Sequence, residues 1–160
     1  MKGSGEAALR EIDRWDHGVG WMAYPDEQMQ RASHAIEVDG EVWVVDPVDA
    51  AGLDDLLADL GEVAGTVVLL DRHKRDSAAI ANRHDVAVHV RDWMDGVAGD
   101  LDAPVERVHR ELGDTGYGVH EVVNNRFWQE AALYGEDTGT LVVPESVGTA
   151  AYFTNADEPL

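Results

Sequence analysis

The chain of 160 residues is long enough for one domain with a hydrophobic core, and its 32 acidic and 12 basic side chains give a net charge of −20 at pH 7. The absence of cysteine excludes disulfides, cysteine-ligated zinc and thiol catalysis. No stripe of Lys and Arg could neutralise phosphates, so nucleic acid is not an expected partner. No apolar run approaches the roughly 20 residues of a membrane span, and residues 1–10 lack a signal-peptide pattern, so a cytoplasmic location is expected.

The surplus of acidic residues indicates adaptation to high salt. A compact domain with this charge repels itself at low ionic strength, whereas at molar salt the Debye length falls to about 3 Å and screens the repulsion. The pattern resembles that of proteins from salt-accumulating halophiles. A generically acidic protein is the alternative. A disordered acidic tail does not fit, because 44% of the residues are hydrophobic and the acids are spread along the chain.

The first half of the chain predicts a helix, a hairpin and a second helix. Apolar residues at positions 7, 8, 9 and 12 predict a helix over residues 6–15, within an N-terminal lead-in that runs to residue 30. Residues 33–38 and 41–46 predict a β-hairpin, because Asp39-Gly40 suits a tight primed turn. The apolar run 42–45 is typical of a strand covered on both faces. Leucines at 53, 56, 57 and 60 then predict an amphipathic helix that ends at Gly61.

The second half predicts alternating strands and a helix, followed by strands alone. Strands over 66–70 and 86–90 flank a helix over 77–84, an order that indicates an α/β layer. Residues 91–114 predict a loop with one short helix, and further strands are expected over 119–123, 130–134 and 140–143. A single domain over residues 1–160 accounts for all of these elements. The side chains expected in its core are Val42, Val44, Val67, Leu69, Val86, Val88, Leu133 and Leu141.

One cluster could carry chemistry, the pattern Asp71-x-His73-x-x-Asp76 between a buried strand and a helix. Side chains at the carboxyl end of a strand can converge on a ligand, and two carboxylates with an imidazole could hold a divalent ion. In so acidic a chain such spacing also arises by chance. Asp76 before Ser77 is equally what a helix N-cap requires, without any metal.

At these residues the chain resembles the metallo-β-lactamase fold family. The resemblance covers residues 33–148: a hairpin that ends in Asp46-Pro47, a helix, and a strand that leads into the loop 71–76, where the family has His-x-His-x-Asp-His. The later hairpin looks like the one that leads to the family's bridging aspartate, which would fall on Glu145. The resemblance implies an αββα sandwich, apparently without its C-terminal part. It also implies a zinc or other divalent-metal site of Asp71, His73, Asp76 and Glu145 if the chain is an enzyme.

The departures from the family pattern argue against an intact metal centre. By register, Asp71 replaces the first histidine of the motif and His73 keeps the second. Arg75 replaces its aspartate and Asp76 its last histidine. The next family histidine would fall on Arg126. A guanidinium group cannot lose its proton to become a ligand, and it places a permanent positive charge where a cation would bind.

Three functional hypotheses follow from the resemblance. In the first, the chain is a non-catalytic, structural or binding module in which Arg75 and Arg126 pair with Asp71, Asp76 or Glu145; no cofactor is then expected. A pocket of Arg75 and Arg126, with Trp128 at its mouth, would then bind a small anionic ligand. Packing in the core is the alternative role of Trp128. The second hypothesis is a hydrolase with a non-standard one-metal site, and the third is an inert fragment.

Overall fold

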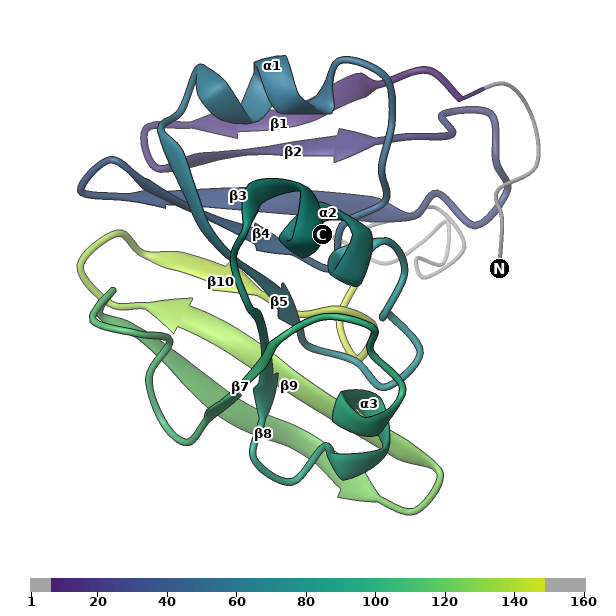
Figure 1. Cartoon of the computed structure of the whole chain (residues 1–160), viewed down its shortest axis with the longest axis vertical. Helices are drawn as coiled ribbons and strands as arrows, with labels where there is room; N and C mark the ends of the chain where they lie inside the picture. The colour runs from purple at the N-terminus through teal and green to yellow at the C-terminus, as the bar shows by residue number, and fades with distance from the viewer. Residues whose placement is uncertain (1–6, 149–160) are drawn as a thin grey trace, which may run out of the picture.

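The computed structural model describes residues 7–148, which form two β-sheets and three short helices (Figure 1). Seven strands form one sheet in sequence order: β1 (Arg10–Trp15), β2 (Gly18–Met22), β3 (Ala32–Val38), β4 (Glu41–Val45), β5 (Glu62–Val68), β6 (Val88–Arg91) and β7 (Val105–Val108). The second sheet has the order β10-β9-β8, with β8 (Tyr117–Asn125), β9 (Trp128–Gly135) and β10 (Thr140–Val142). The helices are α1 (Leu53–Ala58), α2 (Ser77–His84) and α3 (Asp95–Gly99).

The large sheet changes from antiparallel to parallel at its centre. Strands β1 to β4 pair antiparallel, and β4, β5, β6 and β7 pair parallel. The predicted hairpin joins β3 to β4, and both turn residues have positive φ, 52° at Asp39 and 85° at Gly40, as a type I′ turn requires. Because β4, β5 and β6 run the same way, their carboxyl ends meet at one edge of the sheet, and that edge positions the candidate site.

Two hydrophobic clusters hold the layers together. One contains residues of both sheets, among them Trp43 and Val67 from the large sheet and Ala131 and Leu133 from β9. The other joins the four strands β2, β3, β4 and β5 to the apolar side of α1, which includes Leu53 and Leu57. The predicted core is confirmed for Val42, Val44, Val67, Leu69, Val88 and Leu133, all at most 2% exposed.

Four expectations about elements and burial need correction. Residues 10–15 form strand β1 and not a helix, since they pair with β2; the start of the predicted helix, Glu6, lies outside the described residues. Residues 105–108 form an edge strand within the predicted loop. Leu141 is 62% exposed, because its register partner is Tyr134 on the outer side of the small sheet. Val86 is only partly buried. Within residues 7–148, no helix is long and apolar enough to cross a membrane.

Candidate functional site

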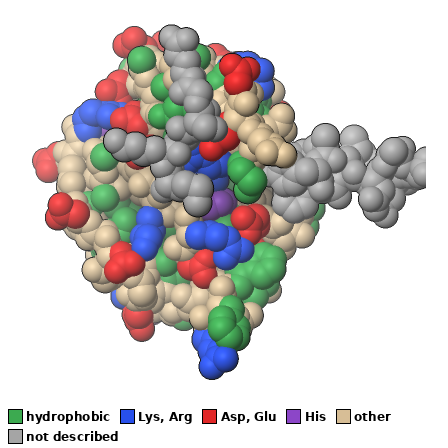
Figure 2. Space-filling view, turned by 90° about the vertical axis from the view of Figure 1, so that its right-hand side faces the viewer, with side chains coloured by type: hydrophobic (Ala, Val, Ile, Leu, Met, Phe, Trp, Pro, Cys, Tyr) green, Lys and Arg blue, Asp and Glu red, His purple; other side chains and the backbone are tan. Residues whose placement is uncertain are grey.

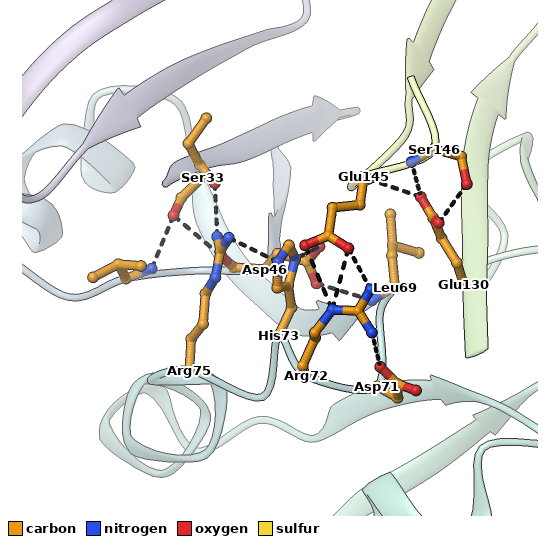
Figure 3. A network of polar contacts seen from close by, with 12 residues as sticks. Ser33, Asp46, Leu69, Asp71, Arg72, His73, Arg75, Glu130, Glu145 and Ser146 are labelled. Atoms are coloured by element: carbon orange, nitrogen blue, oxygen red, sulfur yellow. Dashed lines mark hydrogen bonds and ion pairs between the residues drawn. The ribbon is translucent and has the colours of Figure 1, made fainter. Parts of the chain in front are cut away.

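The carboxyl ends of β4 and β5 bring together residues that are far apart in sequence. Asp46 follows β4, and the loop that holds Asp71, His73 and Arg75 follows β5. The N–H of Asp71 donates to the carbonyl of Gln129 at 3.0 Å, which places β9 of the second sheet beside this loop. Figure 3 shows the resulting network, in which side chains from both sheets point toward one another.

Asp46 is the most connected residue of the network, although it is only 5% exposed. Its Oδ1 accepts the N–H of Leu69 at 2.9 Å, and its Oδ2 lies 3.0 Å from Nδ1 of His73. Its backbone carbonyl accepts Oγ of Ser33 at 3.1 Å and Nη1 of Arg75 at 2.6 Å. Sequence reasoning singled out Asp46 only as part of the Asp46-Pro47 pair that ends the hairpin in the family resemblance, and did not place it in the site. An acidic residue between a fully apolar strand and a proline was the available signal.

Arg75 contacts Nε2 of the His73 imidazole. Its Nη2 lies 3.1 Å from Nε2 of the imidazole. A guanidinium group only donates hydrogen bonds, so Nε2 must accept, and the ring proton is assigned to Nδ1, which donates to Asp46. Both nitrogens of the retained histidine are therefore engaged inside the protein. A metal ion could reach Nε2 only if Arg75 moved away.

Arg75 is held by backbone groups and not by the carboxylates expected from the sequence. Its Nη1 donates to the carbonyls of Ala32, at 2.7 Å, and Asp46. Burial lowers the pKa of the Arg75 guanidinium, and the charge of Asp46 acts in the opposite direction. Asp46 and Arg75 have φ values of 46° and 42°. This left-handed conformation costs about 1 kcal/mol per residue outside glycine, so the surrounding contacts must maintain it.

Arg72, which sequence reasoning missed, makes the ion pairs expected of Arg75 and Arg126. Its Nε donates to Oε2 of Glu145 at 3.1 Å, Nη2 contacts the same oxygen, and Nη1 donates to Asp71 at 3.2 Å. The hydrogen bond to Glu145 is the main reason why the pKa of Arg72 is raised. The guanidinium carbon also lies 5.2 Å from the ring centroid of Trp128, a cation–π arrangement.

The other two predicted residues point elsewhere. Oδ2 of Asp76 accepts the N–H of Asp49 at 2.8 Å. Asp76 does stand at the N-cap position of α2, as the alternative interpretation required, but its side chain makes no capping hydrogen bond. Arg126 is exposed at the β8–β9 turn, where it stacks 4.2 Å from the ring centroid of Phe127. The expected ion pairs of Arg126 with Asp71, Asp76 or Glu145 do not form in the described part of the chain.

A buried carboxylate on β9 was also missed by sequence reasoning. Glu130 is fully buried, and it accepts the N–H groups of Glu145 and Ser146 at 2.8 and 2.9 Å. Its second oxygen accepts Oγ of Ser146 at 2.6 Å. These contacts fix the segment that carries Glu145 and so position the partner of Arg72. No sequence signal separates Glu130 from the many other acids.

The side chains at this edge do not fit a metal ion. His73 is engaged on both nitrogens, Asp71 binds Arg72 and the N–H of Gln129, and Asp76 points toward Asp49. Consistent with this, residues 7–148 contain no group of three or more His, Asp or Glu side chains placed to hold a metal. Metal ligands must converge on one point with free lone pairs, and these side chains diverge.

No family model and no curated protein matches the chain, but solved structures do. It is 11% identical to DIM-1 metallo-β-lactamase exposed to ceftazidime, over 83% of this chain and 68% of that chain, with a TM-score of 0.63. It is 10% identical to VMB-1, over 86% of this chain and 69% of that chain, with a TM-score of 0.63. It is also 10% identical to a metallo-β-lactamase from Pontibacter korlensis, over 81% of this chain and 68% of that chain, with a TM-score of 0.60. At such low identity the likeness shows the fold alone. The predicted metallo-β-lactamase-like αββα sandwich is thereby confirmed.

Proposed function

We propose that this chain is a non-catalytic protein of the metallo-β-lactamase fold, in which an arginine–carboxylate network replaces the metal centre and joins the two sheets. The observation that carries the proposal is the contact of 3.1 Å between Nη2 of Arg75 and Nε2 of His73. It supports a guanidinium group in the place where the family resemblance would put a cation. Salt adaptation and a cytoplasmic location belong to the same proposal and rest on composition alone.

The balance of charge favours a structural role over an anion pocket. The network contains four carboxylates, those of Asp46, Asp71, Glu130 and Glu145, but only two guanidinium groups, those of Arg72 and Arg75. Figure 2 shows basic and acidic side chains intermixed around the histidine visible on that face, without a patch of one sign. A free anion would meet more negative than positive charge here, whereas the internal carboxylates are already paired or hydrogen-bonded.

Metal analysis tests the proposal against the hydrolase alternative. Protein purified from zinc-supplemented cells should contain less than one equivalent of zinc and show no metal-dependent esterase, lactamase or thioesterase activity. The alternative, a one-metal site that includes Asp71, His73, Asp76 and Glu145, predicts bound metal and hydrolysis that His73→Ala abolishes. His109→Ala is the matched control, because His109 is far more exposed and bonds to Asp92. Zinc lost selectively from His73→Ala would reject the proposal.

A further inference from the structure

The guanidinium group of Arg75 is bound by acceptors that three neighbouring strands supply. Its Nη1 donates to the carbonyl oxygens of Ala32 and Asp46, at 2.7 and 2.6 Å, and its Nη2 lies 3.1 Å from Nε2 of His73. Ala32 begins β3, Asp46 follows β4 and His73 lies in the loop after β5. Figure 3 shows the tip of Arg75 directed at this group. We call the two carbonyl oxygens and Nε2 of His73 the acceptor triad.

The terminal nitrogens of Arg75 make all of these contacts. Within residues 7–148, Nε of Arg75 is buried and has no hydrogen-bond partner. The part of the side chain that links the guanidinium group to the backbone therefore adds no hydrogen bond. A free guanidinium ion has the same planar arrangement of N–H donors, so it can make the same three contacts without being attached to the chain.

The charges around the acceptor triad favour a cation. Burial lowers the pKa of Arg75, because it penalises the charged form. The carboxylates of Asp46, Glu145 and Glu27 raise this pKa, and the charge of Arg31 lowers it. Three negative charges thus act on the position of the guanidinium group against one positive charge.

The same acceptors suit a zinc ion poorly. Zinc sites in proteins consist of three or four histidine, cysteine or carboxylate ligands, whereas the acceptor triad has one imidazole nitrogen and two backbone carbonyls. The nearest carboxylate, that of Asp46, accepts the N–H of Leu69 and contacts Nδ1 of His73. A planar cation with several N–H donors satisfies this set, and a metal ion would find a single nitrogen ligand.

We propose that the acceptor triad is a binding site selective for guanidinium cations, and that Arg75 is the ligand which the chain itself supplies. The inference rests on the proposed function, since a metal on Nε2 of His73 would exclude the guanidinium group. Arg75 reaches the site with a φ of 42°, an unfavourable backbone conformation that a free guanidinium ion does not require. Guanidinium from solution should therefore bind when the side chain of Arg75 is removed.

Rescue of Arg75→Gly by guanidinium chloride tests the site. Glycine adopts the left-handed conformation without strain, so this variant loses the side chain and keeps the backbone. Guanidinium chloride, exchanged for KCl at constant ionic strength, should raise the melting temperature of Arg75→Gly by about 3–6 °C at about ten times its dissociation constant. The unmodified chain should show no rise. Arg83→Ala, which loses more exposed ion pairs, is the matched control and should show none either.

Two other cations test the selectivity of the site. Ammonium chloride carries the charge without the planar donors and should raise the melting temperature of Arg75→Gly less than guanidinium does, and zinc chloride should not raise it. No rise with guanidinium, an equal rise with ammonium or a rise with zinc would overturn the proposal. If Arg75→Gly is unfolded, guanidinium should restore a cooperative transition, and failure to do so counts equally against the site. An unmodified chain free of zinc whose variant ignores guanidinium rejects this inference and leaves the proposed function standing.

Discussion

Arg75 combines two properties that are each unfavourable in free energy, so the contacts that compensate for them indicate its role. It adopts a left-handed backbone conformation, and burial lowers the pKa of its guanidinium group. In return it supplies donors to two carbonyls, at Ala32 and Asp46, and to Nε2 of His73. Buried carbonyl and imidazole acceptors that lose a charged donor are left unsatisfied, which costs more than the hydrogen bond itself contributes.

Arg75→Ala should therefore destabilise the fold by about 3 kcal/mol and should not create hydrolase activity, because it breaks a buried polar network from one side. The measurement is the free energy of unfolding in urea at molar KCl. Arg83→Ala is the control: its ion pairs with Asp49 and Asp54 are much more exposed, so about 1 kcal/mol or less should be lost. Equal effects of the two substitutions would argue against a buried structural network.

His34 should make stability fall in mild acid. Burial lowers the pKa of His34 below the ordinary value of about 6.5, and outweighs the nearby charges of Asp13 and Asp46, which raise it. The unfolded chain then binds a proton at a higher pH than the folded chain does. The stabilising contribution is complete above pH about 6.5 and is lost as the pH falls from there toward the folded-state pKa. As the pH is lowered through this range, the urea concentration at the midpoint of unfolding should fall less in His34→Asn than in the control His17→Asn.

At the scale of elements, the sequence pattern predicted correctly those turns, strands and helices that interactions between nearby residues determine. The turn at Asp39-Gly40, the continuous apolar strand 42–45 and the helix 77–84 depend on nearby residues, and they were predicted correctly. Strands β1 and β7 were not predicted, because each forms by pairing with a single neighbour at an edge of the sheet. Strand β1 pairs with β2, and β7 pairs with β6. The loop 71–76 was placed correctly, but whether Arg72 or Arg75 meets Glu145 depends on side-chain direction, which sequence spacing does not determine.

Close packing of the parallel strands predicts a steric effect at Gly65 on β5. A Cβ atom there would lie 2.7 Å from the ring of His89 and 3.0 Å from that of Trp43. Gly65→Ala should cost about 1–3 kcal/mol of unfolding free energy, because both rings are buried and cannot move aside freely. Gly96→Ala in α3 is the matched control, since nothing lies within 4 Å of its added methyl group. Its effect should be neutral or slightly stabilising. A neutral Gly65→Ala would contradict this packing.

At the scale of the whole molecule, net charge dominates the response to solvent. Repulsion among 32 acidic side chains, offset by only 12 basic ones, opposes the compact state at low ionic strength and is screened at molar KCl. The melting temperature should rise steadily across that range. Calorimetry at several KCl concentrations provides the measurement. A flat or falling melting temperature would contradict the halophile interpretation.

The central claim is that Arg75 takes the place of a metal on His73, and nitrogen NMR of the His73 imidazole tests it most directly. The hydrogen bonds predict a proton on Nδ1, directed at Asp46, and an unprotonated Nε2 that accepts from Arg75. Both nitrogen shifts should stay unchanged when zinc is added to the full chain. In Arg75→Ala the Nε2 signal alone should move, because its donor is gone. A zinc-induced shift of Nε2 in the unmodified chain would contradict the account.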